Sequence, residues 1–469
     1  MLSNNSTLKL FDPLGQIIED NGNQHYVKSI LCDGNIIFSK IPSGSLVLLL
    51  CKNQYESIFF YINSIQRGVV VILVDAKIDI SILNPLVEEY APDFIFAPKA
   101  DVLEFNQFSF LFQFRDYIVS ERNSKKNITL NPELSLLLST SGTTGSPKLV
   151  RLSYNNLISN ASSISEYLSL NKNHRAISSL PMNYSFGLSI INSHLFAGGS
   201  ILMTTESITQ RRFWDLFNDF KITSFSGVPY TFEILKKFKL LQINLPSLKM
   251  MTQAGGKLSN ELAEYFTEFS KNHQVDFFIM YGQTEGTARL SYLPPSLISE
   301  KKGSIGIPIP NGNFHIIDDL GNRITKSGVT GELIYEGPNV MLGYAENIYD
   351  LMKANENNGS LKTGDIAYYD KDGFYYIVGR IKRFIKLFGN RVNLDDIENL
   401  LKSKDIESAC VGRDNYLIVY IIDAEQISMT KDFLITKLGI HFSVFDIRLI
   451  NTIPKNSSGK IFYSKLSEL

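Results

Sequence analysis

The chain has 469 residues, 44% of them hydrophobic, and its 46 basic and 47 acidic residues give a formal net charge of -1. This length exceeds the usual limit of a single hydrophobic core, so we expect at least two domains. The balanced charge excludes a general attraction to nucleic acid or anionic membranes, which makes a small-molecule substrate the default expectation.

Cysteine, histidine and hydropathy patterns exclude several further classes of protein. Cys32, Cys51 and Cys410 lie far apart, which predicts reduced core residues, and the six histidines show no metal-binding spacing. The longest apolar runs, residues 46–51 and 69–74, are far shorter than the roughly 20 residues that cross a bilayer. Because the N-terminal segment also lacks the features of a secretory signal, we expect a cytoplasmic protein without a membrane span.

Residues 45–75 indicate a strand, a helix and a strand. Residues 45–51 are apolar, residues 55–66 form an amphipathic pattern that Gly68 ends, and residues 69–75 are rich in β-branched side chains. A βαβ unit of this kind implies parallel pairing of its strands. The same alternation returns at residues 222–228, 259–272 and 275–281. We therefore expect an α/β fold through about the first 300 residues.

A polar loop, residues 139–148 with the sequence STSGTTGSPK, follows the apolar run 134–138 and precedes a helix that Ser153 can cap. Its glycines let the backbone approach a ligand, its hydroxyls can donate hydrogen bonds, and Lys148 adds a positive charge. The loop is not a Walker motif, because only two residues separate its glycines and a proline precedes the lysine. It predicts a phosphate site, with an ordinary polar turn as the alternative.

After residue 303 the pattern changes to short strands and tight turns. This β-rich layer includes predicted strands at residues 313–317 and 331–336, and a hairpin at residues 366–378. The last part of the chain, from about Arg383, indicates a small separate domain. Its predicted elements are a helix at 394–402, strands near Ala409 and at 416–422, a helix at 429–438, and an irregular tail.

Five segments in one order resemble the adenylate-forming superfamily of acyl-CoA synthetases, peptide-synthetase adenylation domains and luciferases. They are residues 139–148, 281–285 (YGQTE), 363–365 (TGD), 379–380 (GR) and 458–460 (SGK). The resemblance runs from about residue 45 to the C-terminus. It implies a large N-terminal domain, residues 1–381, of doubly wound mixed sheets plus a β-rich layer, and a small mobile α+β domain, residues 382–469.

The resemblance also implies a reaction. A carboxylic acid condenses with ATP to an acyl adenylate with release of pyrophosphate, and the acyl group then passes to a phosphopantetheine thiol, with coenzyme A favoured. The implied cofactors are ATP, Mg²⁺ and either coenzyme A or the phosphopantetheine of a carrier protein. One alternative is an acyl or aminoacyl carrier protein ligase. Another is an inactive nucleotide-binding regulator, against which the intact Lys148, Glu285, Asp365 and Lys460 argue.

By the same resemblance, nucleotide-binding roles fall on residues of these motifs. The loop 139–148 would hold the β and γ phosphates, Tyr281 would stack on adenine, and Asp365 would accept hydrogen bonds from the ribose hydroxyls. Lys257 departs from the family, which usually has a small residue and proline after the glycine-rich turn. The implied set is Thr140, Ser141, Gly142, Thr143, Thr144, Gly145, Lys148, Gly255, Gly256, Tyr281, Gly282, Asp365 and Arg380.

The implied catalytic residues are Thr284, which contacts the adenylate phosphate, Glu285, which holds Mg²⁺, and Lys460, which bridges the carboxylate and the α-phosphate. Lys382 occupies the family's hinge position, about which the small domain would swing between the two half-reactions. The alternatives are an exposed loop acid for Glu285, a solvated terminal lysine for Lys460 and, in the nucleotide set, a plain salt bridge for Arg380.

The acid substrate is harder to define. Residues 181–187 match the family segment beside the acyl group, so we expect a pocket formed by Tyr184, Ser185, Gly187 and Tyr230. Amino-acid-activating members usually place an aspartate here, but residues 181–191 contain none. An α-amino acid is therefore disfavoured, and a fatty, aryl or hydroxy acid remains open.

Overall fold

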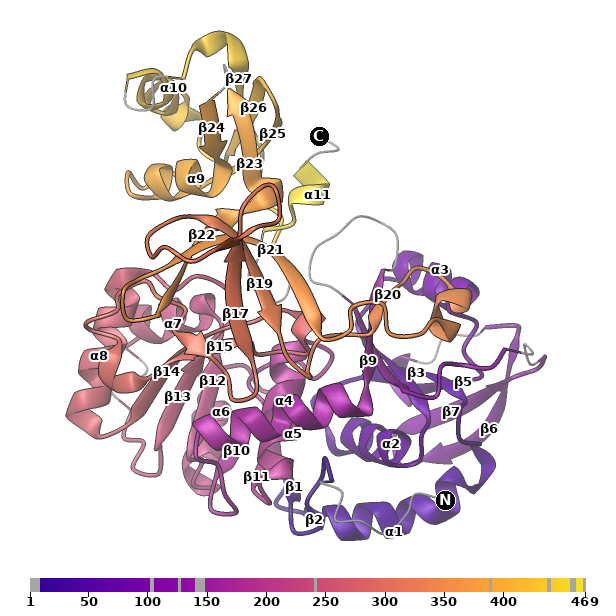
Figure 1. The fold of residues 1–469 in the computed structure, drawn as a ribbon. Helices are drawn as coiled ribbons and strands as arrows, with labels where there is room; N and C mark the ends of the chain where they lie inside the picture. Colours follow the sequence, from indigo (N-terminus) through magenta and orange to yellow (C-terminus); the bar gives the residue numbers. More distant parts are fainter. Residues whose placement is uncertain are drawn as a thin grey trace. The chain divides into compact units, whose positions relative to one another are not determined.

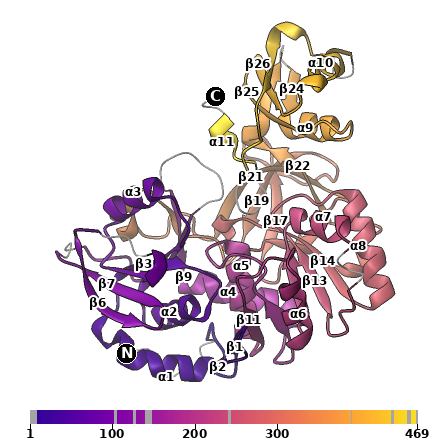
Figure 2. The same ribbon diagram turned by 180° about the vertical axis from the view of Figure 1, so that it is seen from behind.

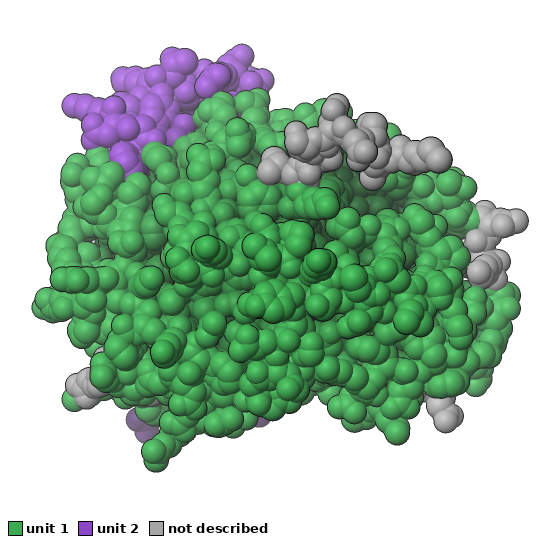
Figure 3. Space-filling model, turned by 90° about the horizontal axis from the view of Figure 1, so that it is seen from below, with its two compact units in different colours: residues 1–140, 145–314, 335–361 green, residues 141–144, 315–334, 362–469 purple. Residues whose placement is uncertain are grey.

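The computed structural model describes residues 9–101, 105–124, 128–139, 148–239, 243–387, 390–436, 440–455 and 461–466. These residues form two compact units, coloured separately in Figure 3. Unit 1 contains the described residues up to 314 together with 335–361, and unit 2 contains residues 315–334 and those from 362 onward. The predicted domain boundary after residue 381 was placed at the proposed hinge and stays a prediction.

Nine strands form the first sheet of unit 1 (Figures 1 and 2). They are β1 (Gln16–Glu19), β2 (Gln24–Tyr26), β10 (Arg175–Ile177), β11 (Ser200–Met203), β12 (Ser224–Gly227), β13 (Met250–Gln253), β14 (Asp276–Tyr281), β15 (Ser291–Leu293) and β16 (Ile307–Pro308). Their order is β16-β15-β14-β13-β12-β10-β11-β1-β2. Parallel pairing joins β14, β13, β12, β10, β11 and β1, and β2, β15 and β16 add antiparallel edges.

Eight strands form the second sheet of unit 1. They are β3 (Leu46–Cys51), β4 (Val70–Asp75), β5 (Phe94–Pro98), β6 (Phe108–Phe114), β7 (Tyr117–Arg122), β8 (Leu134–Ser139), β9 (Leu149–Ser153) and β20 (Gly343–Ala345), in the order β20-β9-β8-β4-β3-β5-β7-β6. The predicted parallel pairing around the βαβ unit is confirmed, because β3 pairs in parallel with β4 and α2 (Tyr55–Gln66) connects them. The mixed α/β class is likewise confirmed.

Two helices fill the space between these sheets (Figure 1). Helix α4 (Tyr154–Tyr167) contacts β8 and β9, helix α5 (Ser185–Phe196) contacts β10 and β11, and the two helices pack on each other. The predicted cap of α4 is confirmed, since Ser153 and Asn156 exchange hydrogen bonds in a capping box. The other helices of unit 1 are α1 (Val27–Ile37), α3 (Ile80–Tyr90), α6 (Arg211–Asp219), α7 (Pro229–Lys237) and α8 (Asn260–His273).

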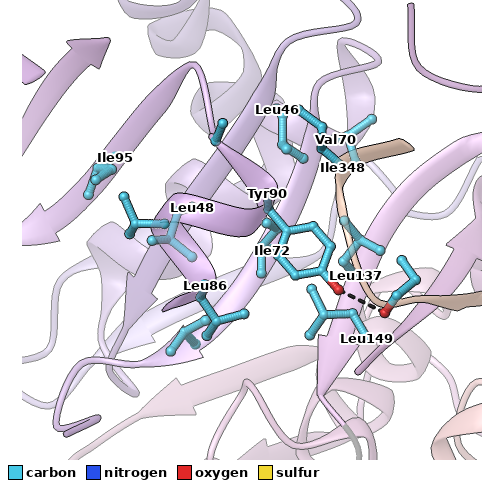
Figure 4. Close-up of a cluster of buried hydrophobic side chains, with 14 of the residues drawn as sticks. Leu46, Leu48, Val70, Ile72, Leu86, Tyr90, Ile95, Leu137, Leu149 and Ile348 are labelled. Carbon is cyan, nitrogen blue, oxygen red and sulfur yellow. Dashed lines mark hydrogen bonds between the residues drawn. The ribbon is translucent and has the colours of Figure 1, made fainter. Parts of the chain in front are cut away.

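A hydrophobic core packs the residues around β20 against the other strands of the second sheet and against α3 (Figure 4). All six residues of β3 are buried, as expected for a strand covered on both faces. Tyr90, at the end of α3, is fully buried in this cluster and donates a hydrogen bond to the carbonyl oxygen of Ala345 at 2.7 Å. Ile348 packs in the same cluster, so the segment that follows β20 is held by apolar contacts as well.

Unit 2 contains most of a five-stranded sheet in the order β18-β17-β19-β21-β22, a two-stranded sheet and a three-stranded sheet. The strands are β17 (Asn313–Ile317), β18 (Arg323–Ile324), β19 (Gly331–Glu336), β21 (Ser360–Tyr369), β22 (Tyr375–Arg380), β23 (Phe384–Leu387), β24 (Asn390–Asn393), β25 (Ser408–Arg413), β26 (Tyr416–Ile421) and β27 (Phe445–Leu449). The predicted hairpin is confirmed as β21 and β22, which Gly373 joins at φ 83°. The helices are α9 (Leu394–Lys402), α10 (Ile427–Thr436) and α11 (Tyr463–Leu466).

The prediction of an irregular tail is wrong. Strand β27 pairs in parallel with β26, and α11 closes a second small core in which Tyr420 donates a hydrogen bond to the carbonyl oxygen of Leu466 at 2.7 Å. The sequence pattern missed both elements for a physical reason. A parallel strand depends on a distant partner, and a helix of one turn is too short to show a helical period.

The three cysteines differ in burial. Cys51 and Cys410 are buried, as predicted, but Cys32 is exposed, so its prediction as a core residue is wrong. Helix α1 buries Val27, Ile30 and Gly34, and Cys32 lies outside this stripe. Within the described part of the chain, no helix combines the length and the apolar character needed to cross a membrane.

Candidate active site

The YGQTE motif begins at the carboxyl end of β14, where open α/β sheets bind ligands. Gly282 is required by packing, because a Cβ there would lie 1.8 Å from the carbonyl oxygen of Ala288 and 2.9 Å from the Cα of Arg289. The chain then turns through a 3₁₀ segment, Thr284–Gly286. This close approach folds residues 282–289 into one compact turn that fixes the directions of Thr284 and Glu285.

The turn closes at Thr287 in a conformation that side chains of this type rarely adopt. Thr287 has φ 66° and ψ -59°, and the amide of Ala288 donates to the carbonyl oxygen of Gly286 at 2.8 Å. A γ-turn of this hand costs about 1–3 kcal/mol and persists only where neighbours enforce it. Asn339 enforces it here, because its side chain donates to Gly286 at 2.8 Å and its carbonyl oxygen accepts from Thr287 Oγ1 at 2.7 Å.

The carboxylate of Glu285 meets a tyrosine whose ring faces a lysine. Tyr344 Oη donates to Glu285 Oε1 at 2.9 Å, and Lys148 Nζ lies 3.7 Å from the centroid of the Tyr344 ring. Burial raises the pKa of Tyr344, and so does the neighbouring Glu285 charge, so the phenol stays protonated and remains a donor at neutral pH. The structure therefore gathers the predicted residues Lys148 and Glu285 around one side chain.

Arg151, on β9, forms hydrogen bonds that hold the segment containing Tyr344. Its fully buried guanidinium donates to Glu356 Oε2 at 2.5 Å, to the carbonyl oxygen of Lys353 at 2.6 Å and to that of Tyr344 at 3.1 Å. Strand β20 pairs antiparallel with β9, with Gly343 opposite Arg151. A Cβ at Gly343 would lie 2.6 Å from Arg151 Nη2, so glycine leaves the space that the guanidinium occupies.

Three predicted segments meet beside this turn. Thr284 is buried, and its Oγ1 donates to the hydroxyl of Ser185, the first residue of α5, at 3.2 Å. Tyr184 precedes α5, and its hydroxyl lies over Gly255, where a Cβ would be only 2.6 Å away. Burial raises the pKa of Tyr184, although Arg289 partly offsets this effect. The predicted adenine turn, acyl segment and phosphate-contacting threonine are thus neighbours.

The turn after β13 is closed by its own hydrogen bond. Gly255 has φ 86°, a conformation that favours glycine, and Gln253 Nε2 donates to the carbonyl oxygen of Gly256 at 2.9 Å. Pro229 lies 3.1 Å from the position of a Cβ at Gly256. Lys257, the departure from the family pattern, is exposed and leaves both glycines in this tight turn.

Three other predicted residues differ in what surrounds them. Tyr281 is half-buried, with its ring centroid 6.4 Å from that of Phe314. Gly187 is a packing position, because a Cβ there would lie 2.1 Å from the carbonyl oxygen of Pro181. Tyr230, in the first turn of α7, is 54% exposed. Its role in the acyl pocket stays a prediction.

Asp365 and Arg380 pair within unit 2. They lie opposite each other on β21 and β22, with Arg380 Nε 3.3 Å from Asp365 Oδ1. Asp365 is 4% exposed, whereas the side chain of Arg380 is 64% exposed. Lys382 follows in the 3₁₀ turn Ile381–Arg383 and is exposed. The role of Lys382 as a hinge stays a prediction.

Seven predicted residues lie outside the described residues: Thr140, Ser141, Gly142, Thr143, Thr144, Gly145 and Lys460. The elements that flank them are described. Strand β8 ends at Ser139, and Lys148 immediately precedes β9. Lys455 and Ile461 form an antiparallel bridge, so the segment that contains Lys460 starts and ends at paired backbone.

Sequence reasoning missed several residues that organise the site, namely Arg151, Arg289, Asn339 and Tyr344. Tyr344 is 59 residues from Glu285, and Arg151 is 193 residues from Tyr344. No motif marks these positions, and their roles depend on the pairing of β9 with β20. Arg289 did carry a signal, since a charged residue four positions after Glu285 enters a segment that is otherwise apolar at 288 and 290.

Comparisons with known proteins identify the family of the chain. The model of the AMP-binding enzyme family matches residues 39–345. Probable 4-coumarate–CoA ligase 1 of Dictyostelium discoideum is 32% identical over 369 residues, which cover 76% of this chain and 65% of that protein. The chain spans about two thirds of the length of the curated relatives it matches, 64% and 65% for the first two.

Solved structures share the fold. The o-succinylbenzoate coenzyme A synthetase of Bacillus subtilis in complex with AMP has a TM-score of 0.77 at 21% identity, over 97% of this chain and 95% of that chain. The same enzyme with ATP and a magnesium ion has a TM-score of 0.75 at 20% identity, over 96% of each chain. Because the family model matches residues 39–345 of 469, the chain belongs to the AMP-binding enzyme family, which confirms its resemblance to the adenylate-forming superfamily.

Proposed function

We propose that this protein is an AMP-forming ligase that joins a carboxylic acid to coenzyme A. A carboxylate oxygen of the acid attacks the α-phosphorus of ATP, and the bond from that phosphorus to pyrophosphate breaks. The thiol of coenzyme A then loses its proton and attacks the acyl carbon, and AMP leaves. Both steps move negative charge onto phosphate oxygens, so catalysis needs cations and hydrogen-bond donors in fixed positions.

The arrangement of Lys148, Tyr344 and Glu285 carries the proposal. The ammonium group of Lys148 lies over the ring of Tyr344, and the carboxylate of Glu285 accepts a hydrogen bond from the hydroxyl of the same tyrosine. A polyphosphate needs such a pair, because the lysine neutralises phosphate oxygens and the carboxylate binds the metal that accompanies them. The Arg151 anchor holds Tyr344 in place before any ligand arrives.

The donor set near Glu285 fits Mg²⁺. Glu285 uses Oε1 to accept from Tyr344, which leaves Oε2 for a metal, and the hydroxyl of Thr284 adds a second hard oxygen nearby in the same turn. When bound, the ion would neutralise phosphate charge. The complex of the Bacillus subtilis enzyme with ATP and a magnesium ion supports this choice of metal.

The remaining roles are proposed from the family. The buried Asp365, aligned by Arg380, would accept the ribose hydroxyls of ATP. Lys460 would deliver its amine to the reacting carboxylate, and a swing about Lys382 would remove it before the thiol arrives. Coenzyme A is the proposed acceptor because the curated relatives are named as CoA ligases. A carrier protein is the competing acceptor.

Pyrophosphate release tests the proposal directly. A panel of fatty, aryl and hydroxy acids is assayed with ATP and Mg²⁺, first with coenzyme A and then with a pantetheinylated carrier protein. We expect acid-dependent pyrophosphate release and a thioester with coenzyme A. Release that does not depend on any acid would refute the function, and thioester formation only on the carrier would refute the acceptor.

A single substitution tests the roles of the lysines. Lys460→Ala should abolish ATP–pyrophosphate exchange and leave thioester formation from a synthetic acyl adenylate largely intact. Lys455→Ala is the matched control, because Lys455 is a nearby lysine that pairs with Glu407 at 2.7 Å. Equal loss of both half-reactions in Lys460→Ala would contradict the two-conformation role.

A further inference from the structure

Arg289 is a buried cation without an anion. It is 1% exposed, its guanidinium carbon lies 4.1 Å from the centroid of the Phe186 ring, and Nη2 donates to Ser189 Oγ at 3.1 Å. Nη1 faces the sulfur of Met280, the hydroxyl of Tyr167 is hydrogen-bonded to the guanidinium, and Nε has no hydrogen-bond partner. None of the ion pairs found in the described part of the chain includes this side chain.

Arg151 shows what a structural arginine looks like in the same unit. It is equally buried, yet it binds the carboxylate of Glu356 and several carbonyl oxygens. An arginine cannot discharge itself by losing its proton in a protein, and a buried charge costs several kcal/mol unless it is paired. A ring face, two hydroxyls and a thioether are weak substitutes for an anion. The position of Arg289 therefore lacks a negatively charged partner.

The backbone of Arg289 is held firmly against the candidate site. Its Cα lies 2.9 Å from the position of a Cβ at Gly282, and its carbonyl oxygen accepts from the side-chain amides of Asn160 at 3.0 Å and Asn339 at 3.2 Å. From this anchor the side chain reaches the first turns of α5. The guanidinium is thus fixed at its base and points toward the helix that begins with Ser185.

The guanidinium lies beside residues 181–187, the segment that contains most of the predicted acyl pocket. Phe186 covers one face of the guanidinium, and Tyr184 interacts with it electrostatically. Tyr184 and Phe186 pack edge to face with ring centroids 6.3 Å apart. Phe186 is buried, and Tyr184 is half-buried. A substrate group that displaces the Phe186 ring would meet the guanidinium directly.

We propose that Arg289 binds a second carboxylate of the acid substrate, so that the substrate class is a dicarboxylic acid. This inference rests on the proposed function, since it names the acid that the ligase activates. One carboxylate reacts with ATP beside Thr284, and the other forms a charge-assisted, two-point hydrogen bond with the guanidinium, to which Nε contributes its free donor. The acyl chain between the two carboxylates replaces the ring that covers Arg289.

Matched pairs of acids test the inference. Pyrophosphate release is measured for monocarboxylic and α,ω-dicarboxylic acids of equal chain length, from four to ten carbons, and for benzoic and terephthalic acid. We expect kcat/KM of the wild-type protein to favour the dicarboxylic member at least tenfold for chains of the right length, roughly the discrimination of one charged hydrogen bond. Equal use, or a preference for the monocarboxylic acids, would overturn the inference.

Variants of the arginine separate binding from folding. Arg289→Met should lower the ratio of dicarboxylic to monocarboxylic kcat/KM by about 10- to 100-fold, mainly through KM, and Arg289→Lys should restore part of it. Arg175→Met is the control, because Arg175 is an arginine of the same unit whose guanidinium donates to Ser200 and to the carbonyl oxygen of Phe220. An unchanged ratio in Arg289→Met would overturn the inference.

The two proposals fail in different ways. If dicarboxylic and monocarboxylic acids release pyrophosphate equally, the ligase function stands and the assignment of Arg289 falls. If no acid of the panel releases pyrophosphate, both fall together. If Arg289→Met does not fold, the preference of the wild-type protein and the Arg289→Lys ratio still decide the question.

Discussion

Substitution of Tyr344 by phenylalanine isolates one hydrogen bond of the candidate site. Tyr344→Phe removes the Oη donor that lies 2.9 Å from Glu285 Oε1 and leaves the ring 3.7 Å from Lys148 Nζ. A hydrogen bond to a charged group contributes about 1.5–3 kcal/mol, which corresponds to about 10- to 150-fold in an equilibrium or rate. We therefore expect ATP–pyrophosphate exchange to fall by that factor, with a higher Mg²⁺ concentration at half-maximal rate.

The pH dependence of the loss gives a second readout. Burial and the charge of Glu285 raise the pKa of Tyr344, so the phenol donates throughout the neutral range. The defect of Tyr344→Phe should therefore stay constant between about pH 6 and 9. Tyr349→Phe makes the same chemical change in a ring that is 68% exposed and should behave as wild type. Exchange rates of Tyr344→Phe within twofold of wild type at every Mg²⁺ concentration would refute the positioning role.

Two further predictions concern stability. Gly282→Ala should lower the free energy of unfolding by at least about 2 kcal/mol in urea titrations, because the new methyl group meets a backbone oxygen at 1.8 Å. Gly321→Ala, with φ 86° and open space around it, should lose only about 1 kcal/mol, and equal losses would contradict the steric argument. Burial lowers the pKa of His194 from 6.5 to about 4, so the unfolded chain takes up the proton first and stability should fall as pH drops from about 6.5 to 4, by up to about 3 kcal/mol. His194→Leu should flatten this part of the pH profile, and an unchanged slope would contradict the assignment.

The sequence predicted those helices and strands whose signals lie within their own residues. The helix Tyr55–Gln66 was predicted with its observed bounds because a glycine follows it, although residues 55–65 are buried on all sides rather than along one stripe. The prediction of an irregular tail failed because β27 is held by a parallel partner and α11 is a single turn. The pattern along one segment carries no information on a partner that another segment supplies.

The residues of the candidate site fall into the same two groups, those marked by a local motif and those brought in by a distant segment. Thr284, Glu285 and Ser185 came from motifs, and the structure places them in one turn and the helix start beside it. Tyr344 and Arg151 could not be predicted, because the antiparallel pairing of β9 and β20 brings them to the site from distant parts of the chain. The unpaired charge of Arg289 likewise becomes visible only once its burial is known.

The unequal burial of the three cysteines has a practical consequence. Burial raises the pKa of Cys51 and Cys410, so neither sulfur forms a thiolate at neutral pH. Cys32 is exposed on α1. A maleimide fluorophore would attach there alone, which makes the unmodified protein ready for single-dye spectroscopy without the removal of any other thiol.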